Sequence, residues 1–330
     1  MKKTFYLYKS GTLKRQDYSL VLIGKNDNVD YIPIEQLDMI ICFSEITLNK
    51  RVLSLLNKYQ ISILFYNFYG NYIGRYIPKE YKDGKVLVNQ VHAYEDPETR
   101  LYIAKTIIAG SIKNMLSVVK YYDKKGKDLK HIITTLNLCL DELEAISSIE
   151  SLLLIEAKSK QIYYLLFDIV LEKEEFSFVK RTKHPPENEV NAMLSYGYAI
   201  LYGMLLSILD RSSLYPQISF IHSLSKNCDS LQFDLADIFK PILVDRLVLR
   251  LIRKKQIKKT FFQLNEEKAC YMTKEGVKIF VKEFDSLMQS TIEYKSKRYS
   301  YRSILSKEVH KYSEYIKGNE KKIHPFIMKW

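Results

Sequence analysis

The sequence predicts an α+β protein, in which a β-rich beginning is followed by a larger helical part. The first 90 residues contain short segments rich in aromatic and β-branched residues, separated by Gly, Asn and Asp, as is typical of strands and turns. From Asp96 onward, long segments carry apolar residues at helical spacing and begin at capping residues. With 330 residues, 47% of them hydrophobic, the chain is long enough for two domains, which we place at residues 1–90 and 91–330.

The first part contains four clear strand segments, which read TFYLYKSG, YSLVLIG, VDYIPI and LDMIICFS. The turn residues KNDN follow the second of them. Ser44 is expected to begin a helix, SEITLNKRVLSLLNKYQ, and the next segment is expected to form a hairpin that turns at Gly70 and Asn71. The many Tyr and Phe residues of this sheet could stack nucleic-acid bases, although core packing and cross-strand pairing are their more common use.

Residues 78–95 (PKEYKDGKVLVNQVHAYE) are expected to link the two domains, because Pro, Gly and charged residues cluster there. Beyond them, Asp96 and Pro97 provide an N-cap and a first-turn proline for a long helix, and a second helix is expected over residues 132–145. Ser147 and Glu150 have capping-box spacing at the start of a third helix. Asn188 then opens a strongly apolar fourth helix.

The charge balance favours a polyanionic partner. Lys and Arg number 51 against 38 Asp and Glu, which gives a net charge of +13 and makes nucleic acid the first candidate, although a solvated lysine-rich surface has the same composition. The four cysteines are far apart and contain no CxxC pair, so disulfides and structural zinc are not expected. No secretion signal or charge-free window of membrane-spanning length is expected, which predicts a soluble, cytoplasmic protein without membrane contact.

The most informative stretch covers residues 221–250, where His222 precedes an amphipathic helix that carries Asp234 and Asp237. Three residues apart on a helix, the two carboxylates project from nearly the same face and can approach one positive object. Pro241 removes the hydrogen bond that the Asp237 carbonyl would otherwise accept, which loosens the turn beside that carboxylate. Capping and a favourable dipole interaction are the alternative role for Asp234.

Two further segments carry charge in unusual places. Glu156 follows a run of apolar residues, and a buried carboxylate needs a metal or an ion-pair partner such as Lys158 or Lys160. The loop before Asn188 holds a basic run that could contact phosphate or simply be solvated. Its members are Lys180, Arg181, Lys183 and His184.

In order and spacing, these segments resemble the CRISPR-associated adaptation integrase, a family also called its endonuclease. The matching segments are Glu156 in SLLLIEAKSKQIYY, the stretch RTKHPPENEVNAMLSYGYAIL, His222 in ISFIHS, and DSLQFDLADIFKPILVD. The terminal segments, including YRSILSKEVHKYSEYIKG and HPFIMKW, resemble the family's C-terminal helices, so the resemblance covers essentially the whole chain. It implies that residues 1–90 form a β-sandwich-like dimerisation domain and that residues 91–330 form an all-α catalytic domain.

The resemblance also implies a site. The family's divalent metal is held by a glutamate, a histidine and a further acidic residue, which map onto Glu156, His222 and Asp237. Asp234 matches an acidic position of the same motif, as a ligand or as a neighbour that supports one. Many members have Glu in place of Asp237 and Arg in place of Lys240; the first change shortens the reach of the carboxylate, and the second loses bidentate phosphate geometry. The expected DNA contacts are Lys180, Arg181, Lys183 and Lys240.

The implied reaction is the insertion of short captured DNA duplexes into a CRISPR repeat array, by transesterification from 3′-hydroxyl ends. Carboxylates suit Mg²⁺, and an added imidazole makes Mn²⁺ suitable as well. Such an ion can polarise a phosphodiester oxygen and activate either a DNA hydroxyl or water. The implied partners are double-stranded spacer and repeat DNA, a second copy of the chain and a small companion subunit. A degradative metal-dependent nuclease and a non-catalytic basic DNA-binding scaffold remain the alternatives.

Overall fold

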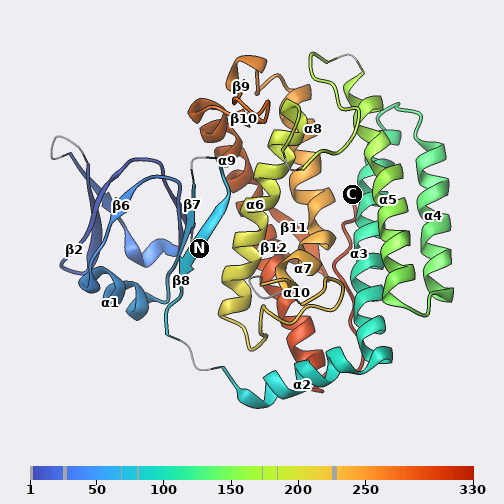
Figure 1. The fold of residues 1–330 in the computed structure, drawn as a ribbon, viewed down its shortest axis with the longest axis horizontal. Coiled ribbons are helices and arrows are strands. Elements are labelled where there is room, and N and C mark those ends of the chain that lie inside the picture. The colour runs from blue at the N-terminus through green and yellow to red at the C-terminus, as the bar shows by residue number, and fades with distance from the viewer. Residues whose placement is uncertain are drawn as a thin grey trace. The chain divides into compact units, whose positions relative to one another are not determined.

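The structure is a computed structural model that describes residues 3–24, 28–67, 69–79, 82–172, 174–183, 185–224 and 229–330. The chain divides into two compact units, Met1–Lys82 and Asp83–Trp330 (Figure 1). Strands build the first unit and helices dominate the second, which confirms the α+β class. Most of the expected KNDN turn, His184 and Cys228 lie outside the described residues; Cys42, Cys139 and Cys270 are buried free thiols.

The first unit is built from two four-stranded sheets with a shared core. One sheet has the order β1 (Lys3–Leu7), β5 (Leu37–Cys42), β7 (Ser62–Tyr66) and β8 (Tyr72–Tyr76), of which only β8 is antiparallel to its neighbour. The other has the order β4 (Val29–Ile32), β3 (Ser19–Gly24), β2 (Gly11–Gln16) and β6 (Ile46–Thr47). Apolar residues of both sheets and of helix α1 (Lys50–Tyr59) pack into one buried cluster, as expected for a β-sandwich-like unit.

Two expectations for this unit were wrong in detail. Strand β2 was not foreseen, because its sequence GTLKRQ buries only Leu13, yet it pairs along its length with β3. The helix expected from Ser44 begins at Lys50, because the side chain of Asn49 caps it by accepting the backbone N–H of Arg51 and Val52. The hairpin of β7 and β8 is confirmed, and Gly70 adopts the positive φ of 83° that its turn requires.

The expected linker is helical from residue 84 onward, so the first unit ends at Lys82 rather than at residue 90. Asp83 caps helix α2 (Gly84–Glu95) by accepting the Lys85 N–H. Gln90 is fully buried, and its amide bonds the backbone of Tyr215 and Ile218. Helix α2 therefore belongs to the second unit and holds the loop that precedes His222.

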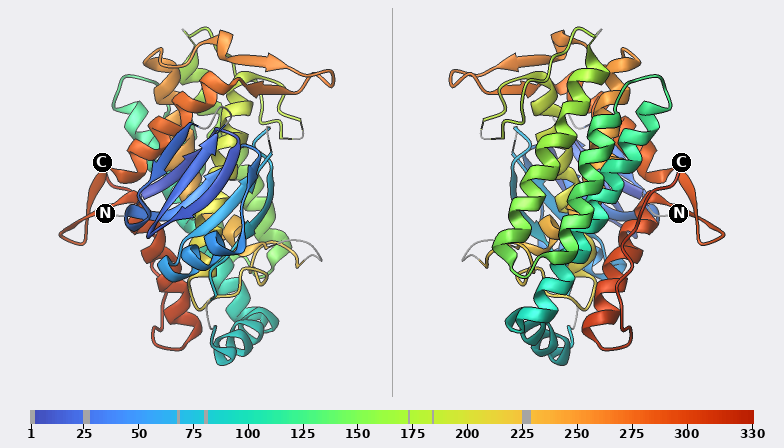
Figure 2. Two further views of the ribbon diagram at one scale, coloured as in Figure 1. Left: turned by 90° about the vertical axis from the view of Figure 1, so that its left-hand side faces the viewer. Right: turned by 90° about the vertical axis from the view of Figure 1, so that its right-hand side faces the viewer.

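The second unit is a helical assembly in which α3, α4 and α5 run side by side (Figure 2, right). Besides α2, its α-helices are α3 (Pro97–Asp123), α4 (Lys130–Ala145), α5 (Ile149–Leu171), α6 (Glu189–Asp210), α7 (Leu231–Phe239), α8 (Arg246–Arg253), α9 (Lys274–Gln289) and α10 (Tyr301–Ile316). The expected caps Asp96 and Asn188 are confirmed, whereas Ser148, not Ser147, caps α5. Short 3₁₀ turns occur at Ile34–Gln36 in the first unit and at Lys259–Phe261 in the second.

The second unit is not purely α-helical. It contains two small antiparallel hairpins, β9 (Phe262–Leu264) with β10 (Cys270–Met272), and β11 (Thr291–Tyr294) with β12 (Lys297–Ser300). The expectation that no charge-free segment reaches membrane-spanning length was also wrong, because residues 190–209 in α6 carry no charged side chain. This segment is a core helix here, since 78% of its most apolar window is buried inside the protein.

Candidate metal centre

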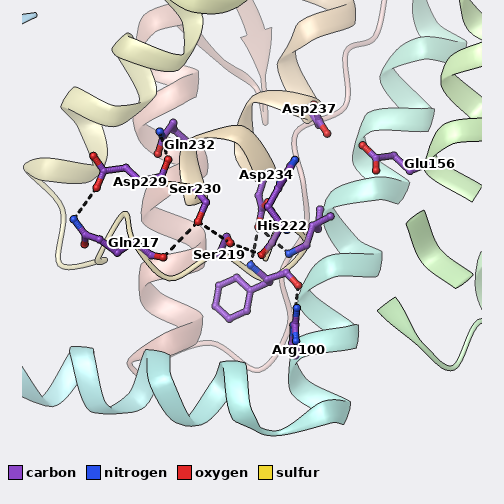
Figure 3. A network of polar contacts seen from close by, with 12 residues as sticks. Arg100, Glu156, Gln217, Ser219, His222, Asp229, Ser230, Gln232, Asp234 and Asp237 are labelled. Atoms are coloured by element: carbon purple, nitrogen blue, oxygen red, sulfur yellow. Dashed lines mark hydrogen bonds and ion pairs between the residues drawn. The ribbon is translucent and has the colours of Figure 1, made fainter. Parts of the chain in front are cut away.

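His222 lies in the loop between α6 and α7, and Asp234 fixes its position (Figure 3). Asp234 is fully buried in the first turn of α7, and its Oδ2 accepts the backbone N–H of Phe220 at 2.7 Å and of Ile221 at 3.0 Å. Its Oδ1 lies 2.5 Å from His222 Nδ1. A carboxylate on Nδ1 holds the proton there and leaves the lone pair of Nε2 for a ligand. Asp234 therefore orients His222, and its own oxygens are occupied by protein donors.

The backbone of this loop is held from several sides. Arg100 on α3 donates to the Phe220 carbonyl at 3.1 Å, and the Ser219 hydroxyl donates to the His222 carbonyl at 2.7 Å. Ser230, which directly precedes α7, donates to the Ser219 hydroxyl at 2.9 Å (Figure 3). A histidine on a loop thus has the fixed backbone that a binding site needs.

Asp237 follows Asp234 on α7 and is almost completely buried, with 1% of its side chain exposed. It forms ion pairs with Lys240 and with Lys160, whose Nζ lies 3.1 Å from Asp237 Oδ2. Directly after α7, residues Lys240–Asp245 form the π-helical segment η3, with Pro241 in its first turn. The backbone irregularity expected from Pro241 is therefore confirmed.

Glu156 on α5 faces Asp237 across the site (Figure 3). The ammonium of Lys160, one turn further along α5, contacts both Glu156 and Asp237. The ion pair that the sequence left open is therefore formed with Lys160, while Lys158 pairs with Glu142. Two carboxylates from distant parts of the chain thus share one cation. Helix α5 is less buried near Glu156 than its apolar sequence suggested, since Leu154 is 71% exposed.

The charges of the site influence one another. Burial raises the pKa of Glu156, and the Lys160 ammonium only partly opposes this rise. Burial alone would also raise the pKa of Asp237, but Lys160 and Lys240 hold it well below its usual range. The hydrogen bond that His222 Nδ1 donates to Asp234 raises the pKa of His222, and the nearby charges of Asp237 and Glu156 add to this effect. His222 therefore lies within electrostatic range of both carboxylates.

A divalent ion fits the donor chemistry of this site. Within the described ranges, no three His, Cys, Asp or Glu side chains are already gathered as a metal-binding cluster. The Lys160 ammonium occupies the space between the Glu156 and Asp237 carboxylates, so this space accommodates a positive charge. Two carboxylates and an imidazole with its Nε2 available are suitable ligands for Mg²⁺ or Mn²⁺.

Basic side chains border the carboxylates. The Arg181 guanidinium donates to Asn191 Oδ1 at 3.0 Å and to Ser195 Oγ at 2.9 Å, both on α6. Burial lowers the pKa of Lys183, and the neighbouring Lys160, Lys240 and Arg181 lower it further. Lys240 pairs with Asp237, Lys183 is within electrostatic range of Asp237, and Arg181 is within electrostatic range of Lys183 and Asp245, whereas Lys180 is exposed on the loop.

Sequence reasoning missed one buried polar chain beside the site. The Tyr198 hydroxyl donates to Asp245 Oδ1 at 2.5 Å, and the Tyr164 hydroxyl lies 3.1 Å from that of Tyr198. Burial raises the pKa of Asp245 to about 7. The Tyr198 ring lies within cation–π distance of both Arg181 and Lys240, at 5.4 and 5.3 Å. The signal was available in Asp245, a lone carboxylate within an apolar helix.

The buried carboxylates and the basic side chains beside them suit a phosphate-bearing ligand, and comparison with known proteins identifies the family of the chain. Residues 5–286 match the family described as CRISPR associated protein Cas1. The chain belongs to the Cas1 family, whose members act as nucleases and integrases of CRISPR adaptation.

Relatives cover the chain almost completely. It is 33% identical over 333 residues to CRISPR-associated endonuclease Cas1 2 of Thermodesulfovibrio yellowstonii, covering 100% of both chains. It is 36% identical over 322 residues to CRISPR-associated endonuclease Cas1 2 of Moorella thermoacetica, covering 97% of each. Among solved structures, a Cas1 protein of Thermotoga maritima matches with a TM-score of 0.86 and 32% identity, over 97% of this chain and 98% of that chain. A casposase bound to its integration product has the same fold, with a TM-score of 0.89 and 20% identity over 99% and 94% of the two chains.

Proposed function

We propose that this protein is the metal-dependent integrase of CRISPR adaptation, which joins the 3′-hydroxyl ends of short DNA duplexes to a repeat array by transesterification. One observation carries the proposal: Glu156 and Asp237, 81 residues apart in sequence, turn their carboxylates to one shared cation beside a fixed imidazole. Glu156, His222 and Asp237 are the proposed ligands, and Mg²⁺ or Mn²⁺ is the proposed ion.

Each residue of the proposed site has a defined role. When bound, the ion supplies Lewis acidity, which polarises a phosphodiester oxygen and favours ionisation of the attacking hydroxyl. Asp234 holds the Nδ1 proton of His222 and thereby keeps Nε2 turned outward as a ligand. Lys160 and Lys240 together balance the charge of the two carboxylates in the metal-free protein, and a bound ion would take the position of the Lys160 ammonium. Arg181, Lys183 and Lys240 bind the phosphates that flank the reacting bond.

The proposed partners are double-stranded spacer and repeat DNA, a second copy of the chain, and the small companion subunit Cas2. The net charge of +13 supports a DNA partner. One solved neighbour is a complex that contains Cas1 and Cas2, with a TM-score of 0.83 and 20% identity over 99% of this chain and 36% of that chain. For the second copy, we propose that the β-rich unit forms part of the contact.

The test compares Asp237→Asn and Glu156→Gln with the control Glu142→Gln. Glu142 also pairs with a lysine of α5, but it lies outside the site. Its substitution therefore makes the same chemical change without altering the proposed metal ligands. The assay joins short 3′-hydroxyl duplexes to a repeat-containing plasmid in Mn²⁺, with filter-bound DNA measured at one fixed salt concentration. We expect Asp237→Asn and Glu156→Gln to lose joining but to bind DNA, and the control to do both.

The alternatives give different results. A degradative nuclease would cut the plasmid and join nothing, and a scaffold without catalysis would bind DNA without changing its covalent structure. Joining at the wild-type rate by Asp237→Asn would exclude Asp237 as a metal ligand.

A further inference from the structure

The chain beyond α10 returns in an extended form beside α3 (Figure 1). We call residues 323–328 the C-terminal tail. Its backbone is held at several points: the buried Glu308 carboxylate accepts the Phe326 N–H, the Ser117 hydroxyl donates to the Met328 carbonyl at 2.7 Å, and the Tyr102 hydroxyl accepts the Ile323 N–H. A tail bound in this way is a regular part of the second unit.

Asn114 of α3 joins this tail to α7. Its side chain is fully buried, and its Nδ2 donates to the Ile238 carbonyl at 2.8 Å and to the Phe326 carbonyl at 2.9 Å. Its Oδ1 accepts the Met328 N–H at 2.8 Å. One amide thus connects three segments, and one of its partners, Ile238, directly follows Asp237.

The contact lies where the helix changes from α to π geometry. Ile238 is near the end of α7, and η3 begins two residues later at Lys240. A side-chain hydrogen bond to a helix carbonyl at such a change determines how the helix turns there. The tail reinforces the contact, because the ring of Phe326 stacks on that of Phe239 with centroids 5.9 Å apart and planes 13° apart.

We propose that Asn114 is a positioning residue for Asp237, and that the C-terminal tail acts with it. By fixing the Ile238 carbonyl and the Phe239 ring, they set the rotation of the turn that carries Asp237 and Lys240, and so the direction in which the Asp237 carboxylate faces Glu156. Ligand positions in metal sites must be held to about 0.5 Å. This inference rests on the proposed role of Asp237 as a metal ligand.

The test uses full-length Asn114→Leu, which keeps the approximate size of the side chain and removes both donated hydrogen bonds. The matched control is Ser117→Ala, which removes a tail contact from the same helix without touching α7. Mn²⁺ affinity is measured by calorimetry and by electron paramagnetic resonance, at a fixed interval below the Tm of each variant. We expect the dissociation constant for Mn²⁺ to rise about tenfold or more in Asn114→Leu, as when a residue that orients a ligand is lost, and to stay within about twofold in Ser117→Ala.

Several outcomes would overturn the inference or its basis. Wild-type Mn²⁺ affinity in Asn114→Leu, or an equal loss in both variants, would show that Asn114 acts only on general stability. If wild-type protein binds no Mn²⁺, or Asp237→Asn binds it with wild-type affinity, the proposed metal site is wrong. The inference about Asn114 is then wrong as well, because it depends on that site. Should Asn114→Leu not fold, Phe326→Leu is measured instead; it weakens the stack on Phe239, and it must also lower Mn²⁺ affinity for the inference to stand.

Discussion

At the scale of single residues, the pairing of His222 with Asp234 decides which imidazole nitrogen faces outward. Asp234 accepts the backbone N–H groups of Phe220, Ile221 and His222 in addition to its contact with His222 Nδ1, so both of its oxygens are bound by protein groups. The sequence left open whether Asp234 is a capping residue, a ligand or a neighbour of one. Its contacts favour the last of these.

We expect Asp234→Asn to lower the pKa of His222 in the metal-free protein, because the hydrogen bond that His222 donates to the Asp234 carboxylate is the main cause of the raised value. A nuclear magnetic resonance titration of the imidazole measures this directly. The control is Asp229→Asn, since Asp229 binds the Gln217 amide at 2.7 Å. An unchanged His222 pKa in Asp234→Asn would contradict the pairing.

The same pair has a defined effect on stability. Because the folded-state pKa of His222 is raised, the pair stabilises the fold fully below the unfolded value of about 6.5 and loses this contribution as pH rises through the folded value. In Asp234→Asn, the free energy of unfolding should therefore change less over this pH range than it does in the wild type.

At the scale of elements, the sequence predicted most helices and several strands, because caps and apolar periods are local signals. Asp96 and Pro97 begin α3, and Pro241 marks the π-helical segment, as expected. Sequence-based prediction failed where a contact with a distant part of the chain determines which unit an element joins. Residues such as Gln90 make α2 part of the helical unit through a loop far along the chain, and no local pattern reveals such a contact.

The same limit applies to the site. Glu156 and Asp237 could be singled out because a carboxylate in an apolar run and a proline beside an acid are visible in sequence. Their joint role with His222 as metal ligands follows from the resemblance to the family and stays a prediction. The bridging position of Lys160 and the contact of Asn114 with Ile238 depend on how α5, α3 and α7 pack together. Residues 124 positions apart carry no sequence signal of their contact.

The close approach of the C-terminal tail to α3 requires a glycine at position 110. A Cβ there would lie 2.8 Å from Pro325 Cβ and 3.5 Å from Ile238 Cγ1. We expect Gly110→Ala to lower the free energy of unfolding in urea by about 1–3 kcal/mol through overpacking. Gly84→Ala is the control, because a Cβ at Gly84 meets nothing within 4 Å and alanine favours the helix. Equal stability of the two variants would refute this account of the tail.

At the scale of the whole molecule, the excess of 13 positive charges should dominate DNA binding. We expect the logarithm of DNA affinity to fall linearly with the logarithm of salt concentration, by about 0.9 for each phosphate contacted, because counterions are released. Fluorescence anisotropy with one duplex over a range of NaCl concentrations measures the slope. A flat response would mean that phosphate contacts contribute little.

The proposed dimer can be tested without deleting the β-rich unit. Strand β4 is the last strand of its sheet and exposes Val29 and Tyr31, the latter by 68%. Exposed apolar residues on an edge strand favour pairing with another chain. We expect light scattering to report a monomer for Tyr31→Glu. The control Leu138→Glu changes an exposed leucine of α4 in the other unit and should remain a dimer. A dimeric Tyr31→Glu would place the contact elsewhere.

Helix α6 has a consequence for how the protein is made. Its charge-free segment is buried by α7, η3, β10 and α10, all of which lie later in the chain. The ribosome therefore releases this apolar helix well before the elements that cover it, and growing chains expose a surface that chaperones and membranes bind. We therefore expect chains truncated after α6 to be produced in lower soluble yield than the full chain, whatever the stability of the finished fold.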